Sequence, residues 1–260
     1  MQARVKHSEV VVDQFTRQAQ QFAQSPGARN EEILACILRM AQPHPADTAL
    51  DVACGPGVLA CALAKTMRHV TGIDLTPAML DQARKTQAEQ QVQNVTWDLG
   101  NVTALPYHDA SFDVVTCRFA FHHFRDPLAV LRNIRRVCRP GGRIVVADSA
   151  PVAAKADAFN AMERLRDPSH TQAFPVEKLT ALFEKAGLPQ PRFEPMRLAL
   201  ELDSLLSRSW PREGDQARIR AMFEHALLED TLDIQPRRQQ GQIVFSFPVA
   251  ILGVQVPHAG

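Results

Sequence analysis

The strongest chemical signal in the sequence is a glycine loop between a hydrophobic strand and a helix. Residues 50–60 read Leu-Asp-Val-Ala-Cys-Gly-Pro-Gly-Val-Leu-Ala. Glycines permit a tight turn and let a ligand approach the backbone closely, and the N–H groups at the start of the helix point at that ligand. The spacing Gly55-x-Gly57-x-x-Ala60 also fits a dinucleotide fingerprint, so the loop alone does not decide which nucleotide-containing ligand is bound.

Two acidic residues narrow the choice of ligand. Asp51 precedes the loop, where its carboxylate could attract a ligand cation but would repel a pyrophosphate. Asp74 ends the next hydrophobic run, and its carboxylate can accept hydrogen bonds from two adjacent ribose hydroxyls, which suits both NAD and an adenosyl ligand. Leu75 follows, Thr76 is expected to cap the next helix, and Met79 on that helix either covers an adenine ring or belongs to the core.

A third segment with ligand-binding chemistry follows another predicted strand. Residues 100–107 read Gly-Asn-Val-Thr-Ala-Leu-Pro-Tyr. The side chain of Asn101 and the free backbone amides of this loop can hydrogen-bond to an adenine edge, while Val102 and Leu105 supply apolar contact. We therefore expect this segment to form the adenine side of the same site.

The motifs lie on short apolar runs that alternate with helical segments. The runs predict strands at residues 49–53, 69–73, 95–98, 114–117 and 143–147. Strands that alternate with helices imply a parallel sheet in an α/β fold. Outside this part, the pattern predicts helices at 9–22, 31–40, 176–186 and 203–230, and strands at 192–200 and 243–256.

Taken in order, five motifs resemble those of the class I S-adenosylmethionine-dependent methyltransferases, most of all the ubiquinone/menaquinone-biosynthesis-type branch that methylates small molecules. They read D-V-A-C-G-P-G, T-G-I-D, G-N-V-T-A-L-P-Y, S-F-D-V-V and R-P-G-G-R-I. The resemblance is strong from Phe15 to about Asp148 and weaker beyond. It implies a Rossmann-like, seven-stranded, mostly parallel sheet with helices on both faces, an N-terminal helical cap and a helical insertion before the last strand.

The resemblance also divides the chain into three parts. An N-terminal helical cap is expected at residues 1–42, a cofactor-binding core at 43–150, and the C-terminal part of the same domain at 151–260. The insertion near 203–230 is expected to wall the acceptor pocket with Trp210, Met222, Phe223 and His225, and its apolar content favours a hydrophobic or aromatic metabolite.

By the same resemblance, the cofactor is S-adenosyl-L-methionine. The positions expected to contact it are Phe22, Asp51, Ala53, Gly55, Gly57, Asp74, Leu75, Met79, Asn101, Val102, Arg118 and Phe119. Asp74 would bind the ribose, Asn101 with Val102 would bracket the adenine, and Phe22 would reach the cofactor from the cap. The sequence departs from the family pattern at two positions, since Ala53 replaces a common glycine and Asn101 stands where aspartate is commoner.

His122 and His123 are the candidate catalytic residues because they follow a strand and an imidazole near its ordinary pKa can act as a base. Methyl transfer from a sulfonium is a direct displacement in which positioning can supply most of the acceleration, so a structural hydrogen bond is the alternative role for either histidine. Their adjacency is expected to send the two side chains in different directions. Because the five cysteines are scattered without a C-x-x-C pair, we predict no protein-bound metal.

Composition excludes several classes of function. The 260 residues carry a formal net charge of +1, so a nucleic-acid-binding surface is not expected. No apolar run approaches the roughly 20 residues of a membrane helix, and the N-terminus lacks a secretory signal, so we predict a cytoplasmic protein with a small-molecule acceptor as partner. A homodimer is compatible with the sequence. The alternatives are a nicotinamide-dependent oxidoreductase and a non-catalytic module that binds S-adenosylmethionine.

Overall fold

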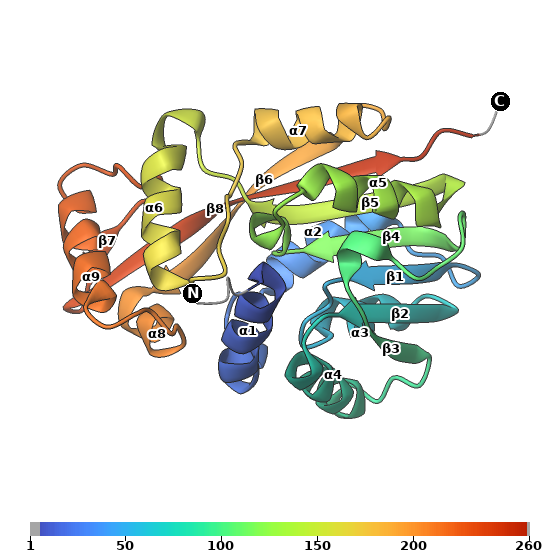
Figure 1. The fold of residues 1–260 in the computed structure, drawn as a ribbon, viewed down its shortest axis with the longest axis horizontal. Coiled ribbons are helices and arrows are strands. Elements are labelled where there is room, and N and C mark those ends of the chain that lie inside the picture. Colours follow the sequence, from blue (N-terminus) through green and yellow to red (C-terminus); the bar gives the residue numbers. More distant parts are fainter. Residues whose placement is uncertain (1–5, 259–260) are drawn as a thin grey trace, which may run out of the picture.

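The structure, a computed structural model that describes residues 6–258, is built on one mixed sheet (Figure 1). Its strands are β1 (Thr48–Val52), β2 (His69–Asp74), β3 (Val95–Leu99), β4 (Phe112–Arg118), β5 (Cys138–Ser149), β6 (Arg192–Glu201), β7 (Arg237–Gln239) and β8 (Gln242–Gln255). They are ordered β3-β2-β1-β4-β5-β8-β6, with the short β7 paired to β8. The first five strands run parallel, and β8 is antiparallel to both β5 and β6. The expected mostly parallel α/β sheet is confirmed, with β7 as an additional strand.

The parallel register brings the chemical motifs to one edge of the sheet. Leu50 of β1 pairs with Thr71 of β2 on one side and with Val115 of β4 on the other. The carboxyl ends of the three strands therefore lie next to one another, as is general for ligand sites in open parallel sheets. The glycine loop after β1, the acid that ends β2 and the segment after β4 consequently meet at this edge.

Helices cover both faces of the sheet, as expected. They are α1 (His7–Ala23), α2 (Glu31–Ala41), α3 (Val58–Ala64), α4 (Pro77–Glu89), α5 (Pro127–Val137), α6 (Ala156–Arg166), α7 (Val176–Lys185), α8 (Leu202–Ser207) and α9 (Asp215–Ala226). Ile33 of α2 and Leu59 of α3 belong to one buried cluster, while Ile134 of α5 and Phe183 of α7 belong to another. Helix α1 lies against α4 and forms the N-terminal cap (Figure 1).

The first half of β8 extends beyond the parallel part of the sheet. Strand β5 pairs only with the residues of β8 from Val249 onward, whereas β6 pairs with β8 from Val244. Helices α6, α8 and α9 gather around this extension (Figure 1). The predicted helical insertion is thus present, as two helices, while α6 was not predicted because its segment showed no clear periodicity between two prolines, Pro151 and Pro168. No helix within residues 6–258 is long and apolar enough to cross a membrane.

Both the backbone conformation and the neighbouring side chains favour glycine at position 57. It begins α3 with a φ of 74°, and a Cβ at this position would lie 2.4 Å from Cη2 of Trp97 and 2.9 Å from Cβ of Ala83. Gly214 has a similar φ of 81° but has no atom within 4 Å of the same position. Substitutions at these two positions can therefore separate the cost of steric overlap from the cost of a left-handed backbone conformation.

We expect Gly57→Ala to lower the free energy of unfolding by about 3 kcal/mol, because steric overlap adds to backbone strain. Gly214→Ala should lower it by only about 1 kcal/mol, which is the cost of the backbone conformation alone. Urea unfolding followed by circular dichroism measures both values. Equal losses in the two variants would contradict the tight fit of Trp97 against Gly57.

Candidate active site

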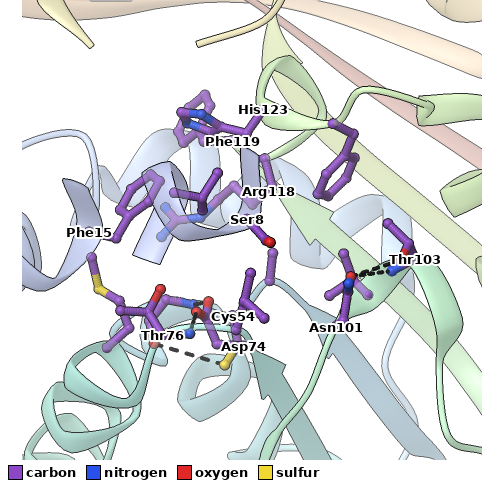
Figure 2. A pocket seen from close by; sticks show the side chains of 18 of the residues that line it. Ser8, Phe15, Cys54, Asp74, Thr76, Asn101, Thr103, Arg118, Phe119 and His123 are labelled. Atoms are coloured by element: carbon purple, nitrogen blue, oxygen red, sulfur yellow. Dashed lines mark hydrogen bonds between the residues drawn. The ribbon is translucent and has the colours of Figure 1, made fainter. Parts of the chain in front are cut away.

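A cavity with a volume of about 370 Å³ lies at the carboxyl ends of β1, β2 and β4. Figure 2 shows Asp74 and Cys54 on one side of this cavity and Phe119 and His123 on the other. Of the residues predicted to contact a cofactor, those that line it are Phe22, Ala53, Gly55, Asp74, Leu75, Met79, Asn101, Val102, Arg118 and Phe119. The structure thus gathers most of the predicted set around one cavity, and we call it the first cavity.

The glycine loop forms the floor of the first cavity in a left-handed conformation. Ala53, Gly55 and Gly57 have φ values of 54°, 53° and 74°, respectively. Ala53 therefore holds a conformation that favours glycine, which explains why glycine is common there in the resembling family. The ring of Phe22 from α1 lies over the loop, 4.0 Å from where a Cβ on Gly55 would be.

Asp74 connects the glycine loop to the start of α4. Its Oδ2 accepts a hydrogen bond from the Gly55 N–H at 2.9 Å, and its Oδ1 accepts one from the Thr76 N–H at 2.8 Å. Burial raises the pKa of this carboxyl. Thr76 is the N-cap residue of α4, as the sequence predicted, although its side chain makes no capping hydrogen bond. Each carboxylate oxygen keeps a lone pair that can accept a further hydrogen bond at the cavity.

Asp51 and Gly57 are not among the residues that line the first cavity, so the cofactor contact expected of each stays a prediction. Asp51 belongs to β1, is 2% exposed and accepts a hydrogen bond from Oγ1 of Thr116 at 2.7 Å. Its side chain stays inside the sheet layer because it precedes the end of the strand. Gly57 precedes α3, and its N–H donates to the Cys54 carbonyl oxygen at 3.0 Å.

Asn101 uses only half of its side-chain amide within the protein. Its Oδ1 accepts hydrogen bonds from the N–H and the Oγ1 of Thr103, at 3.0 and 2.9 Å, and thereby caps a short 3₁₀ turn at Val102–Ala104. Its Nδ2 donates to no residue among 6–258 and borders the first cavity. The amide N–H₂ is therefore available to a ligand.

Arg118 fastens the N-terminal cap to the end of β4. Its guanidinium donates to the carbonyl oxygens of Gly27 and Ala28, at 3.4 and 2.9 Å, in the turn between α1 and α2. Burial lowers its pKa to about 10, so it remains a cation at neutral pH. The neighbouring Phe119 has a φ of 53°, an unusual conformation for a bulky residue, and donates its N–H to the Ala147 oxygen at 2.7 Å.

The two adjacent histidines lie in a 3₁₀ turn, Phe121–His123, and their rings are close together. The ring centroids are 4.2 Å apart, so the expectation that the side chains point in different directions is wrong. It fails because the residues are in neither an extended strand nor a regular helix. His122 donates its Nδ1–H to Oδ1 of Asp148 at 2.5 Å, and Oδ2 of the same carboxylate accepts the N–H of Phe121 at 2.7 Å.

The surroundings shift the pKa values of the two imidazoles in opposite directions. Despite burial, the carboxylate of Asp148 raises the pKa of His122. Burial together with the charge of His122 lowers the pKa of His123 to about 4. Nδ1 of His123 lies 3.1 Å from the Ser169 carbonyl oxygen, which can only accept, so Nδ1 carries the proton and Nε2 carries a free lone pair.

Comparison with known proteins shows which family the chain belongs to. The family described as "Methyltransferase domain" matches residues 50–146. The uncharacterized protein YafE of Escherichia coli is 32% identical over 168 residues, which is 64% of this chain and 81% of YafE. The uncharacterized methyltransferase YcgJ of Bacillus subtilis is 29% identical over 214 residues, 82% of this chain and 85% of YcgJ. The chain belongs to the S-adenosylmethionine-dependent methyltransferases.

Two further comparisons extend this result for the methyltransferase. The crystal structure of YcgJ superimposes with a TM-score of 0.78 at 25% identity and covers 88% of this chain and 99% of YcgJ. The demethylmenaquinone methyltransferase of Deinococcus radiodurans is 40% identical over 124 residues, 47% of this chain and 50% of that protein. The fold and family that the motifs indicated are therefore confirmed, and the oxidoreductase alternative is set aside.

A second, smaller cavity of the methyltransferase, with a volume of about 110 Å³, adjoins the first. Four side chains line both cavities: Phe15, Phe22, Phe119 and His123. The ring centroid of Phe15 lies 6.0 Å from that of Phe22 and 5.0 Å from that of His123, so these rings form a continuous aromatic boundary. His122 lines only the second cavity.

The predicted acceptor wall is only partly where the sequence placed it. Among residues of the insertion, those that line the second cavity are Leu205, Arg208 and Ser209. Trp210, Met222, Phe223 and His225 do not line it, and Phe223 is fully buried against Phe245. Phe223 and the partly buried Met222 pack in the hydrophobic cluster that contains Phe245, whereas Trp210 is half-buried and His225 is exposed.

Sequence reasoning missed several polar residues around the cavities. Asp148 ends β5 and holds His122, while Asp167 and Ser169, after α6, hold His123. His7 of α1 donates its Nε2–H to the His123 oxygen at 2.8 Å. The only sequence signal among them was Asp148, an acid at the end of a predicted strand like Asp74. Within the described part of the chain, no group of three histidine, cysteine, aspartate or glutamate side chains could hold a metal ion.

Asp51 gives this methyltransferase a testable pH dependence of stability. Burial raises its pKa from 3.8 to about 6. Because the folded state favours the protonated acid, the stability that this group contributes is complete below about pH 3.8 and is lost as the pH rises through about 6.

We expect Asp51→Asn to remove this loss, so that the variant gains roughly 2 kcal/mol of unfolding free energy relative to the wild type between pH 4 and pH 8. Urea unfolding of both proteins across this pH range measures the difference. The exposed Asp81→Asn on α4 is the control, and its difference from the wild type should not change with pH. A pH-independent difference for Asp51→Asn would contradict the raised pKa.

Proposed function

We propose that the first cavity binds S-adenosyl-L-methionine and that a small-molecule acceptor binds in the second cavity, where it receives the methyl group. When bound, the cofactor supplies an electrophilic methyl group on a sulfonium. The chain's own residues bind it, orient the acceptor for in-line displacement and exclude water. The observation that carries the proposal is the aromatic boundary of Phe15, Phe22, Phe119 and His123, shared by two adjoining cavities.

The free polar atoms of the first cavity fit an adenosyl ligand. Asp74 keeps lone pairs for two ribose hydroxyls, since its two internal hydrogen bonds use one position on each oxygen. The free Nδ2 of Asn101 can donate to an adenine nitrogen, and the buried Met79 and Val102 can cover the ring faces. The Arg118 cation borders the same cavity and matches the carboxylate of the methionine portion.

The acceptor is expected to be an apolar or aromatic metabolite. Phenylalanines and leucines form much of the second cavity, including Leu198, Leu205 and Phe247. The relative from Deinococcus radiodurans is named a demethylmenaquinone methyltransferase, which supports an acceptor of quinone type, although the match covers half of that protein. We propose that residues 203–230 contribute to acceptor binding through Leu205, Arg208 and Ser209.

We propose that His123 takes the acceptor's proton and that His122 holds the turn in place. Nε2 of His123 has no partner among residues 6–258 and belongs to a side chain that borders both cavities. Its pKa of about 4 keeps the imidazole neutral at pH 7 and makes it a weak base, which suits an acceptor whose own proton is acidic. His122 is instead an ion-pair partner of Asp148.

A cytoplasmic location, the absence of a nucleic-acid partner and a possible homodimer stay predictions from the sequence.

Binding of S-adenosylhomocysteine tests the first cavity. We expect isothermal titration calorimetry to show binding of this product and none of NAD. Asp74→Ala should weaken the binding about 100-fold, because two hydrogen bonds to a charged group are lost. The exposed Asp81→Ala should bind like the wild type. Failure of the wild type to bind S-adenosylhomocysteine would overturn the proposed cofactor. A second experiment incubates the protein with a metabolite extract and labelled S-adenosylmethionine. If the protein binds S-adenosylhomocysteine but methylates no molecule in the extract, a non-catalytic module is favoured.

His123→Asn tests the proton acceptor. We expect a fall in kcat of about 10-fold to 100-fold with unchanged affinity for S-adenosylhomocysteine, because the amide can keep the hydrogen bond to Ser169 but cannot take a proton. The wild-type kcat/KM should remain level down to about pH 5, since the pKa of His123 is about 4. The exposed His108→Asn should match the wild type, and unchanged turnover of His123→Asn would reject the role.

A further inference from the structure

Arg208 is a cation in the wall of the second cavity, and it has no ionic partner in the part of the chain that the structure describes. It follows α8, and its Nε donates to the Ser204 carbonyl oxygen at 2.7 Å. Its Nη2 is inaccessible to solvent and has no hydrogen-bond partner. Within residues 6–258, no carboxylate lies within ion-pair distance of this guanidinium. A buried N–H donor without a partner is costly, and the cost is larger when the group is charged.

The other charged groups around the second cavity already have partners. Arg166 donates two hydrogen bonds to the Glu163 carboxylate, at 2.7 and 2.6 Å. Asp167 accepts from the N–H and the Oγ of Ser169, at 2.8 and 2.6 Å. Both acids are therefore engaged elsewhere, and Arg208 carries an unmet hydrogen-bonding capacity in this wall.

The electrostatic surroundings of Arg208 also favour an anion. Burial and the nearby positive charge of Arg166 lower its pKa, and only Glu201 opposes them. Because a second cation lies close by, a negatively charged group at this point would interact favourably with both guanidinium groups. Arginine is suited to this role because its planar fork can donate two parallel hydrogen bonds to one carboxylate or phosphate.

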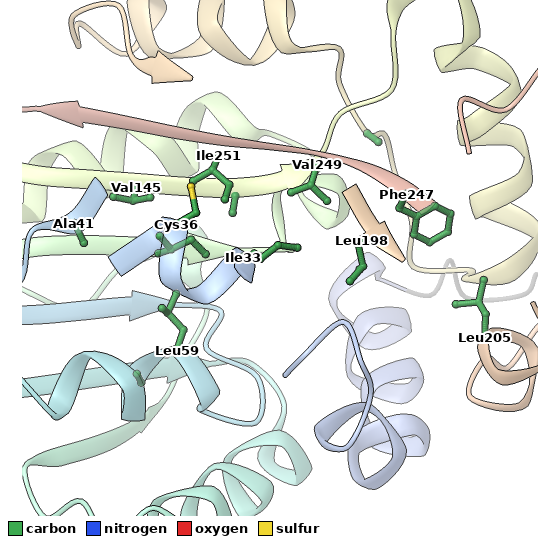
Figure 3. Close-up of a cluster of buried hydrophobic side chains, with 14 of the residues drawn as sticks. Ile33, Cys36, Ala41, Leu59, Val145, Leu198, Leu205, Phe247, Val249 and Ile251 are labelled. Carbon is green, nitrogen blue, oxygen red and sulfur yellow. The ribbon is translucent and has the colours of Figure 1, made fainter. Parts of the chain in front are cut away.

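The second cavity has an apolar part in addition to its polar residues, which include Ser149, Arg166 and Asp167. Figure 3 shows Leu198 on β6, Phe247 on β8 and Leu205 on α8, all members of one buried hydrophobic cluster. These three residues and Arg208 line the same cavity. A ligand for this space must therefore combine an apolar body with one group that can pair with a cation.

The geometry points to an acceptor that carries a carboxylate or phosphate group, which Arg208 binds inside the second cavity while the apolar body lies toward the aromatic boundary. This inference rests on the proposed function, because it specifies the class of molecule that the second cavity holds. Arg208 borders only the second cavity, whereas Phe15 and Phe119 border both. The anionic group thus fixes one end of the acceptor and leaves the other end toward the first cavity.

The experiment uses the full chain loaded with S-adenosylhomocysteine and measures the binding of matched small probes by calorimetry. Isobutyrate and benzoate are each compared with the corresponding neutral amide, and phenyl phosphate is compared with benzamide. We expect at least one anion to bind about 10-fold to 100-fold more tightly than its neutral counterpart, as is typical of a hydrogen-bonded charge. The carboxylate and phosphate arms distinguish which anion the site prefers.

Substitutions at position 208 assign the effect to this residue. Arg208→Gln should reduce anion binding to the level of the amide, and Arg208→Lys should retain part of the preference because it keeps the charge but not the fork. Arg212→Gln removes an exposed arginine from the same segment and should bind like the wild type. Because Arg208 is only half-buried as a whole, both variants should fold, and their melting temperatures verify this.

The outcomes separate this inference from the proposed function. If no anion binds more tightly than its amide, or if Arg208→Gln binds anions as the wild type does, the inference is overturned while S-adenosylhomocysteine binding still supports the first cavity. If the chain does not bind S-adenosylhomocysteine, the proposed function fails instead. Anion binding by the chain without S-adenosylhomocysteine, lost in Arg208→Gln, would still support the Arg208 site.

Discussion

The candidate site depends on one buried carboxylate at the end of β2. Asp74 accepts the N–H of Gly55 and the N–H of Thr76, so it joins the glycine loop after β1 to the first turn of α4. A carboxylate in this position holds two neighbouring strand ends in register and still offers lone pairs to a ligand. The other cavity walls are arranged around this junction, because β1 and β2 pair directly in the sheet.

Backbone strain and aromatic packing surround this junction. Ala53 and Phe119 both have positive φ values and line the first cavity. Such conformations persist only where neighbouring structure fixes them. Here the sheet fixes both ends, and Arg118 fastens the N-terminal cap across them through the carbonyl oxygens of Gly27 and Ala28. The cap can therefore bring Phe22 over the glycine loop without belonging to the sheet.

The length of β8 creates the second cavity. Because β8 continues past β5, it carries β6 and the helices of the C-terminal extension alongside the ends of the parallel strands. Asp148, at the end of β5, holds the histidine turn at the boundary between the two parts. The parallel core and the C-terminal extension are thus joined by one strand, β8, which belongs to both.

The sequence by itself predicted most of the strands and helices and most of the residues that line the first cavity, because local patterns of glycine, acid and apolar residues specify a strand, a loop and a helix in succession. Only the tertiary structure showed that Asp51 stays inside the sheet, that the rings of His122 and His123 lie close together, and that Nη2 of Arg208 has no hydrogen-bond partner within residues 6–258. Turns and helix caps are local properties that residue order encodes. Burial, charge pairing and cavity shape depend on residues far apart in the chain, so they are decided when β8 brings the C-terminal extension against the core.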